Sequence, residues 1–539
     1  MLLAAAAARS LPPYPARSTN LTVAAGFPRE VIRPSLLGLD LEFTRHDLFA
    51  GLSAELIANR LFALQPPNTT WPQRFPPGFP PRWVALPNGS APAIGGAFSA
   101  ATCTLAPAAP LCGLQQLPVG DGFSAGLSWG SAIGVEGGRG YTFRAVVRAA
   151  GTAGGAGLAL RVALEPAIFS ASLPVPEGGW VELAFSFVAP ATVPRADSLA
   201  LWVVGAAGSL TFNATSLLPD DHWLGMRQDV VDALRDLAFP GPLRYPGGCF
   251  APFYKWKAAL APLLSRPPML SPPDYCEALA GGVDTFTDGF VENGPNIDEY
   301  VALAAYVGAT PAVTIPLQFG TQQEIQDAVD LVSYCNGDAG APGNAWAALR
   351  AARGHPAPYG VKIFYMGNEI GWQARFPDYP AQPANKAPPA TGAEYAAMLA
   401  ALVPALRAVD PSLTLLAVSA DAAFNQAWLN TAAVTPFVGA ASAHVGYANS
   451  DAGGSPASAA AATAQAKLPH TSVLPQLVAT RAMLDAGAGW GRHVRISVDE
   501  WGLGPPWAVA DFNTAHALFG ASFLTMALNS AAENGVEFT

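Results

Sequence analysis

The chain has 539 residues, of which 51% are hydrophobic, and this is enough apolar material for two or three domains with large cores. Only 13% of the residues are charged, the formal net charge is −10, and no cluster of Lys and Arg is interleaved with aromatic residues. These features exclude a nucleic-acid-binding protein and favour neutral or small-molecule partners. No run of about 20 uninterrupted apolar residues occurs, so the sequence predicts no membrane span and no membrane partner.

The N-terminal part of the chain begins with a predicted leader or extended segment over residues 1–32. Its first residues, "MLLAAAAARS", have the hydrophobicity of a signal region but lack a basic leader. Residues 37–43, "LGLDLEF", then predict a β-strand. A Pro-rich stretch from residue 66 to residue 92 separates this strand from the next part of the chain.

Residues 88–218 differ in texture from the rest of the chain. They contain short β-rich runs that alternate with Gly-rich turns, and they show no helical periodicity. The runs are "YTFRAVVRAA", "LALRVAL", "WVELAFSFV" and "SLALWVVG". Several short strands at such spacing are typical of a β-sandwich. We therefore predict that residues 88–218 form an inserted all-β, jelly-roll-like, carbohydrate-binding-like domain.

Helices and strands alternate after Asp220. The patterns predict helices at 226–237, 296–308, 321–335, 392–410, 472–484 and 512–535, and strands at 243–248, 311–317, 361–366, 414–420, 439–445 and 493–498. With the strand at 37–43 this gives seven strands, and "GVEFT" at the C-terminus begins an eighth. The α/β alternation predicts a (β/α)8 TIM barrel made of residues 33–87 and 219–539, with strand 8 incomplete and placed beside strand 1.

Two glutamates follow predicted barrel strands. "FYMGNEIGW" places Glu369 after the fourth barrel strand, and "HVRISVDEW" places Glu500 after the seventh. Because strand C-termini open on one face of a barrel, the two carboxylates are expected to share one mouth. Glycoside hydrolysis needs at least two such carboxylates. Acids at strand ends can instead bind metals or abstract protons. Taken alone, Glu369 could also be a turn residue whose side chain faces water.

Other candidate site residues also follow strands. Glu42 ends the first strand, and the alternative to a role in the site is that its side chain caps a helix. His444 and Tyr447 follow the sixth strand, and a lone His at such a place is more often a hydrogen-bonded core residue.

Cysteines and sequons bear on the cellular compartment. No Cys-x-x-Cys pair occurs among the five cysteines, so no zinc site is predicted, while Cys103 and Cys112 are close enough in sequence to form one disulfide. Sequons stand at Asn20, Asn68, Asn88 and Asn213. Together they favour the secretory route, and we expect a glycosylated, extracellular or cell-wall protein.

Several stretches resemble glycoside hydrolase family 51 α-L-arabinofuranosidases, especially the plant-type branch. They include "LLGLDLEFTRHDLFAGLSAELIANRLF", "LRYPGGCF", "WAALRAARGHPAPYGVKIFYMGNE" and "VRISVDEWG". "GSLTFNATSLLPDDHWLGMRQDVVDAL" is similar to the junction between the β-sandwich and the barrel of that branch. The resemblance covers residues 30–539.

The resemblance implies roles for individual residues. Glu369 would be the general acid/base, Glu500 the nucleophile, and Asn368 the partner of the sugar hydroxyl beside the anomeric carbon. The remaining substrate-binding residues would be Glu42, Cys249, His444, Tyr447 and Trp501, with Tyr447 orienting Glu500 and a buried structural thiol as the alternative for Cys249. No cofactor and no metal are implied.

The implied activity is the release, with retention of configuration, of terminal α-L-arabinofuranosyl residues from arabinose-containing polysaccharides or glycoproteins. A β-xylosidase or endoglucanase of the same clan would use the same two glutamates, and a glycan-binding protein with an inactive barrel is the alternative outside enzymes. Two departures stand out: an extra residue separates His444 from Tyr447, and the chain ends at Thr539, early in strand 8. An unpaired sheet edge there would lower solubility and activity.

Overall fold

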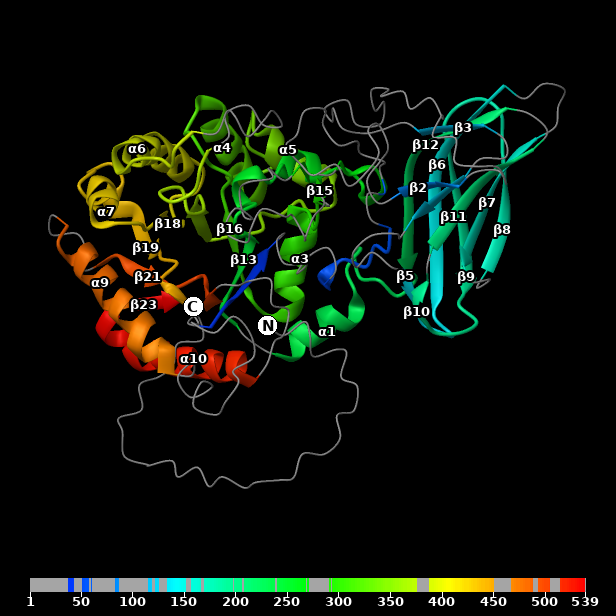
Figure 1. The fold of residues 1–539 in the computed structure, drawn as a ribbon. Coiled ribbons are helices and arrows are strands. Elements are labelled where there is room, and N and C mark those ends of the chain that lie inside the picture. The colour runs from blue at the N-terminus through cyan, green and yellow to red at the C-terminus, as the bar shows by residue number, and fades with distance from the viewer. Residues whose placement is uncertain are drawn as a thin grey trace, which may run out of the picture.

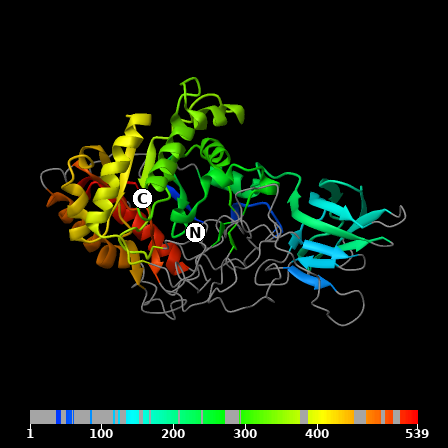
Figure 2. The same cartoon turned by 90° about the horizontal axis from the view of Figure 1, so that it is seen from above.

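The structure is a computed structural model. It describes residues 37–42, 51–57, 60, 83–86, 115–118, 122–125, 133–151, 157–165, 169–196, 198–205, 208–237, 240–267, 269–270, 290–291, 293–375, 387–449, 467–487, 493–504 and 514–538. Two parts are visible in Figures 1 and 2: a curled parallel sheet surrounded by helices, and a group of antiparallel strands beside it.

The parallel sheet has eight strands in the order β1-β13-β16-β17-β18-β19-β21-β23. Their bounds are β1 Leu39–Glu42, β13 Pro242–Gly247, β16 Thr310–Thr314, β17 Ile363–Met366, β18 Thr414–Val418, β19 Val438–Ser442, β21 Arg495–Ser497 and β23 Val536–Phe538. Each neighbouring pair is parallel, so the C-terminal ends of all eight strands lie on one face. The predicted TIM-barrel-like α/β architecture is therefore present.

The position of the eighth strand differs from the prediction. β23 pairs with β21 in parallel, with Val536 opposite Ile496. Within the described residues, no pairing joins β23 to β1. The sequence correctly indicated a strand here but placed it beside strand 1, because local pattern does not determine which edge a terminal strand joins.

Helices cover the outside of the parallel sheet (Figure 1). They are α1 Gln228–Asp236, α2 Trp256–Ala259, α3 Ile297–Val307, α4 Gln322–Asn336, α5 Ala345–Ala352, α6 Gly392–Val409, α7 Ala422–Leu429, α9 Leu474–Asp485 and α10 Thr514–Asn534. α3, α4 and α6 each begin with a capping box, in which the cap side chain and the glutamate three residues later satisfy backbone N–H groups reciprocally. The sequence reading missed α5 and α7, which have only eight residues each.

α6 is apolar enough over its 18 residues to cross a membrane by length and composition. In the fold it lies against α4 and α7, and it buries Tyr395, Leu399, Leu402 and Leu406. The apolar character of α6 is therefore accounted for by its packing on the barrel.

Two layers of hydrophobic side chains hold the barrel together. A small inner cluster contains Ala312, Ile363, Tyr365, Leu416 and Ala440, which come from four adjacent strands. A much larger cluster joins the opposite faces of the strands to the helices. This double burial explains why the predicted strands read as nearly continuous apolar runs rather than as alternating ones.

Between β1 and β13 the chain forms an all-β part, which we call the antiparallel region. Its strands are β2 Trp83–Leu86, β3 Gln115–Pro118, β4 Gly122–Ala125, β5 Ile133–Val135, β6 Gly140–Ala150, β7 Leu158–Glu165, β8 Phe169–Val175, β9 Val181–Val188, β10 Val193–Ala196, β11 Ser198–Val204 and β12 Ser209–Pro219. Nine of them form a sheet in the order β2-β4-β11-β7-β8 and another in the order β3-β12-β6-β9, and β5 pairs antiparallel with β10. Buried side chains of both sheets form one cluster, so the two sheets pack face to face. β2 lies before the predicted boundary at residue 88, and the last strand ends at Pro219 rather than 218.

Two shorter pairings complete the secondary structure. β14 (Met269–Leu270) pairs antiparallel with β15 (Phe290–Val291), and β20 (Gly446–Asn449) pairs parallel with β22 (Trp501–Gly504). The second pair extends the mouth of the barrel, because β20 follows β19 and β22 follows β21.

The structure contradicts one glycosylation prediction. Asn213 is only 2% exposed within β12, whose C-terminal half is buried on both faces. A glycan cannot be accommodated on a side chain enclosed by the folded protein, so the prediction of glycosylation at Asn213 is wrong for this fold. The sequons at Asn20, Asn68 and Asn88 and the pair Cys103 and Cys112 lie outside the described residues.

Glu55 lies between Leu52, which packs in the barrel cluster, and Ile57, which packs in the cluster of the antiparallel region. Its carboxylate accepts hydrogen bonds from Ser216 Oγ at 2.6 Å and from the backbone N–H of Leu217 at 2.8 Å, both in β12. The backbone N–H of Ile57 adds a third bond at 3.0 Å. A cavity of about 40 Å³ adjoins this carboxylate.

Candidate active site

The turn after β17 presents Glu369 in an unusual backbone conformation. Gly367 has φ of 96°, and a Cβ there would lie 2.2 Å from Cδ1 of Ile370, so only glycine fits. Glu369 itself has φ of 46°, in the left-handed region that L-residues other than Gly seldom adopt. Such strain persists only where the surroundings impose it, and it is typical of functional sites.

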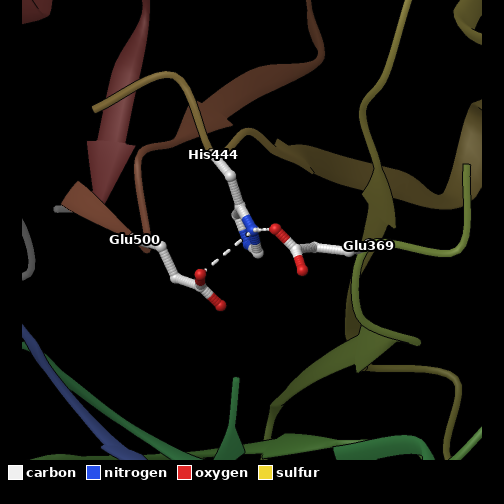
Figure 3. A group of neighbouring side chains, drawn as sticks. All are labelled: Glu369, His444 and Glu500. Carbon is white, nitrogen blue, oxygen red and sulfur yellow. Dashed lines mark hydrogen bonds and ion pairs between the residues drawn. The ribbon is translucent and has the colours of Figure 1, made fainter. Parts of the chain in front are cut away.

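Glu369, His444 and Glu500 converge from three strand ends (Figure 3). Nδ1 of His444 lies 2.9 Å from Oε1 of Glu369 and 3.3 Å from Oε2 of Glu500. One carboxylate oxygen from each glutamate and one ring nitrogen of His444 lie within 4.8 Å of one another. The structure thus brings the two predicted glutamates together, with the imidazole between them.

Arg244 is a charged member of the site that the sequence reading did not single out. It lies on β13, is 2% exposed, and its Nη1 lies 2.8 Å from Oδ2 of Asp40 and 3.1 Å from Oε1 of Glu500. Its guanidinium also lies 5.0 Å from the ring centroid of Tyr365. A signal was available, because an arginine within the apolar strand "LRYPGG" must find buried partners.

The Pro-Gly-Gly turn leaves room for Asp40. A Cβ on Gly247 would lie 1.8 Å from Oδ1 of Asp40, so any larger residue would displace this carboxylate. Asp40 stands two residues before Glu42 on β1, and the register of β1 against β13 shifts between them. The turn thus lets Asp40 reach Arg244.

Asn368 and Gln373 complete the surroundings of the two glutamates. Asn368 is 1% exposed, and its Oδ1 accepts a hydrogen bond from Nη2 of Arg244. Within the described residues its Nδ2 has no hydrogen-bond partner, so this buried N–H pair can bind an incoming hydroxyl. Nε2 of Gln373 donates to Oε2 of Glu369.

Three carboxylates determine the charge of His444. Burial alone would lower the pKa of its imidazole, but Glu500, Glu369 and Asp499 outweigh that effect and raise the pKa to about 10. The site therefore contains two cationic groups, His444 and Arg244, among four acidic ones, Asp40, Glu369, Asp499 and Glu500.

The trio Glu369, His444 and Glu500 has the composition and the spacing of a metal-ligand set. However, the guanidinium of Arg244 already lies 3.1 Å from Glu500 and would repel a cation bound there. This guanidinium therefore disfavours a metal ion beside Glu500.

The other predicted site residues are placed as follows. Glu42 ends β1 opposite Gly247, and Tyr447 lies in β20 opposite Gly502, at the same face of the sheet as the glutamates. The structure does not describe the side chains of these two residues. Their predicted contacts with sugar and with Glu500 remain predictions.

The structure shows contacts for two further predicted site residues, Cys249 and Trp501. Cys249 is disulfide-bonded, whereas Cys335 is a free, buried cysteine. The alternative of a buried structural thiol at Cys249 is therefore wrong. Trp501 stacks on Phe523 of α10 with ring centroids 4.3 Å apart, and its predicted sugar contact remains a prediction.

The fold and the site define a TIM-barrel-like α/β protein with clustered acids at the C-terminal ends of its strands. The model of the alpha-L-arabinofuranosidase 1 domain matches residues 233–451, which contain Glu369 and His444. An intracellular exo-α-(1→5)-L-arabinofuranosidase of Streptomyces lividans is 30% identical over 193 residues, which are 36% of this chain and 25% of that enzyme. An extracellular exo-α-L-arabinofuranosidase of Streptomyces chartreusis is 26% identical over 293 residues, 47% of this chain and 32% of that enzyme.

The fold has a solved counterpart. The arabinose-bound MgGH51 α-L-arabinofuranosidase superposes with a TM-score of 0.63 and 18% identity, covering 95% of this chain and 75% of that one. This likeness shows the fold, and the matched domain over residues 233–451 agrees with the resemblance to glycoside hydrolase family 51. It spans a quarter to a third of the length of the curated relatives given above, whose names include both intracellular and extracellular enzymes.

Proposed function

We propose that the chain is a retaining glycoside hydrolase that releases terminal α-L-arabinofuranosyl residues from arabinose-containing polysaccharides or glycoproteins. The observation that supports this most strongly is the approach of the Glu369 and Glu500 carboxylates to within 4.8 Å at one end of the barrel. Retaining enzymes hold their two carboxyl groups about 5–5.5 Å apart, whereas inverting enzymes leave room for a water molecule.

The proposed roles follow from what surrounds each acid. Glu500, whose carboxylate lies 3.1 Å from the guanidinium of Arg244, attacks the anomeric carbon. Glu369 protonates the glycosidic oxygen as the C–O bond breaks, and a covalent glycosyl–Glu500 ester forms. Glu369 then takes a proton from water, which attacks the same carbon and releases the sugar and the Glu500 carboxylate.

Substrate contacts are proposed on the same basis. The unpaired Nδ2 of Asn368 would donate to the hydroxyl beside the anomeric carbon, and Glu42 would bind further hydroxyls. Trp372 is 49% exposed, and its ring lies edge-on to His444 at 6.5 Å, so it offers an aromatic surface at the mouth. Glycans that carry terminal arabinofuranose are the proposed partners.

The antiparallel region is proposed to be an inserted, carbohydrate-binding-like domain that contacts the polymer or shapes the cleft. The face-to-face packing of its two sheets supports an independent core. Deletion of residues 88–218 should spare hydrolysis of small aryl substrates and weaken hydrolysis of polymers. Loss of both activities in a chain whose barrel is folded would instead make the region part of the active site.

The disulfide at Cys249 supports an extracellular or cell-wall location, because disulfides persist in oxidising compartments. Export can be tested by expressing the full-length gene in its own host and assaying the medium, the wall fraction and the cell lysate. Activity and protein confined to the lysate would contradict this part of the proposal.

The decisive experiment for the activity is hydrolysis of an aryl α-L-arabinofuranoside followed by ¹H NMR. The first-formed arabinose should have the α configuration before it mutarotates. A first-formed β product would indicate inversion, and hydrolysis of aryl β-xyloside or cellulose instead would indicate another clan activity. Binding of arabinan without any turnover would identify a glycan-binding protein.

A further inference from the structure

Two buried polar atoms face each other beside the proposed acid and lack hydrogen-bond partners. Within the described residues, neither Nε2 of His444 nor Oδ1 of Asp499 has such a partner, although they lie 3.8 Å apart. The two side chains are 3% and 5% exposed, so bulk water does not satisfy these atoms. Buried polar atoms without partners are costly, and a small approach of the two groups would satisfy both.

The other contacts of Asp499 fix its orientation. Its Oδ2 accepts a hydrogen bond from Ser442 Oγ at 2.7 Å and lies 3.9 Å from Nε of Arg244. With Oδ2 engaged in this way, Oδ1 is the oxygen that faces the imidazole. The charged groups around His444 are then Asp499 on the Nε2 side, and Glu369 and Glu500 on the Nδ1 side.

We propose that Asp499 is a positioning residue that holds a proton on Nε2 of His444, so that Nδ1 carries the exchangeable proton of the His444–Glu369 pair. This inference rests on the proposed function of Glu369 as general acid. The hydrogen bond at one ring nitrogen of a histidine determines what the other nitrogen can do. The carboxylate of Asp499 can only accept a hydrogen bond, so Nε2 keeps its proton. Nδ1, which faces Glu369, can then act as donor or acceptor.

The proton then has a complete path through both halves of the reaction. In the first half, the Nδ1 proton passes 2.9 Å to Glu369, and Glu369 gives one proton to the glycosidic oxygen as the C–O bond breaks. The imidazole is left neutral, with its remaining proton on Nε2 facing Asp499. In the second half, Glu369 takes a proton from the attacking water and Nδ1 takes one back, which restores the starting state.

This arrangement accounts for the charge on His444. Its pKa of about 10 keeps the imidazole protonated at neutral pH, which would be at odds with a neutral carboxyl on Glu369 if the two groups acted separately. As one pair they hold a single mobile proton that resides on His444 and is delivered through Glu369. His444 is therefore the proton store, and Asp499 determines which ring nitrogen releases the proton.

The first test compares Asp499→Asn with Ser442→Ala. The second substitution removes the hydroxyl that donates to Oδ2 of Asp499 and keeps the charge of the carboxylate. The amide that replaces the carboxylate in Asp499→Asn can donate to Nε2 and so favours a proton on Nδ1 alone. General acid catalysis contributes about 10²–10⁴-fold, so Asp499→Asn should lower kcat/KM at least about 10²-fold on aryl arabinofuranosides with poor leaving groups. Substrates with a dinitrophenyl leaving group, which need little protonation, should lose less than about 10-fold.

The pH profile gives a second readout that a merely structural role would not change. In Asp499→Asn the basic limb of kcat/KM should move to lower pH, because the imidazolium loses one of its three carboxylate neighbours. Ser442→Ala loosens Asp499 but keeps its charge, so it should move the limb less than Asp499→Asn does. Equal loss on good and poor leaving groups with an unchanged pH profile would overturn the inference.

A third readout is independent of turnover. ¹⁵N NMR of histidine-labelled wild-type protein, with His444→Gln to assign the resonances, should show both ring nitrogens of His444 protonated at pH 7. A neutral His444, or one with a proton on Nδ1 only, would overturn the inference even if Asp499→Asn did not fold. If the wild type hydrolysed no arabinofuranoside, the proposed function would fail while this measurement still decided the role of Asp499.

Discussion

Charged side chains lie at buried strand ends in the parallel sheet, whereas they lie on outer surfaces in the antiparallel region. Arg244, with a 2% exposed side chain, contacts Asp40 and Glu500 inside the barrel mouth. In the antiparallel region, Arg144 and Glu182 pair at 2.6 Å with side chains 50% and 45% exposed. The buried polar side chains among the described residues of β5–β12 are uncharged, namely Thr211, Asn213, Thr215 and Ser216.

This difference shows which part of the fold accepts a loss of stability in order to hold reactive groups. Burying a charge is expensive unless it is paired and hydrogen-bonded, so a protein concentrates buried charges only where their interactions are needed. The antiparallel region, in its described residues, has no such concentration and is stabilised by apolar contact between its sheets. The barrel mouth instead balances four acids against His444 and Arg244 in a small volume, which is typical of catalytic sites.

The largest expected effect separates the two acids of the barrel mouth. Glu500→Ala should abolish turnover of every arabinofuranoside, a loss on the order of 10⁴-fold or more, because the attacking oxygen is gone. Glu369→Ala should spare the first step for substrates with good leaving groups. Steady-state kinetics with and without azide measure this, and azide should restore turnover in Glu369→Ala with retained configuration.

The control for this pair lies in the antiparallel region. Glu182→Ala removes an exposed carboxylate of the same kind and should leave kcat unchanged on the same aryl substrates. If Glu369→Ala and Glu500→Ala lost equal activity on an activated substrate and neither responded to azide, the assigned roles would be incorrect.

Arg244→Met should produce the largest loss of stability. The substitution leaves the carboxylates of Asp40 and Glu500 buried beside one another without their guanidinium. Breaking a buried ion pair by removing one partner typically costs about 3–5 kcal/mol. Urea unfolding at pH 7 measures this loss, and a change below about 1 kcal/mol would show that water or rearrangement compensates the acids.

Glu55, at the joint between the two regions, should make stability depend on pH. Burial raises the pKa of its carboxyl to about 7, against the lowering effects of Arg60 and of the donors from Leu217, Ser216 and Ile57. A carboxyl whose pKa is higher in the folded state binds protons more tightly there. Its contribution is therefore fully present below the unfolded-state pKa of 4.5 and is lost as pH rises through about 7.

The size of this effect follows from the shift. A change from 4.5 to about 7 corresponds to about 3 kcal/mol, at 1.36 kcal/mol for each pKa unit. Glu55→Gln resembles the neutral carboxyl at every pH, so it should match the wild type near pH 4.5 and be more stable near pH 8. Urea unfolding of both proteins across this range measures the difference, and a difference that stayed constant with pH would contradict the assignment to Glu55.

The sequence predicted the barrel well because its elements have strong local signals. α6 combines a capping box with a long apolar pattern, and β17 is a short run of aromatic and β-branched residues closed by Gly367. The missed helices α5 and α7 are short, with eight residues each, so each offers only about two turns of pattern. The predicted pairing partner of β23 was wrong, because which strand it pairs with depends on residues far away in the sequence.

The two glutamates of the site were also predictable, since each follows a strand whose end faces the barrel mouth. The placement of His444 between them was not, because it depends on side-chain conformations from three separate strands.

The smallest expected effect lies in the antiparallel region and tests the comparison most directly. Arg144 and Glu182 lie on the adjacent strands β6 and β9 and pair at 2.6 Å, closer than Arg244 to either of its carboxylates. Exposed ion pairs contribute only about 0.2–1 kcal/mol, because water screens the attraction and two long side chains lose freedom. A double-mutant cycle with Arg144→Ala and Glu182→Ala, followed by urea unfolding, should give a coupling energy in that range. The coupling should shrink further in 1 M salt, where the screening length is about 3 Å. A coupling above about 2 kcal/mol, or one that resists salt, would mean that distance rather than burial governs ion-pair strength in this protein, and the contrast between the two regions would fail.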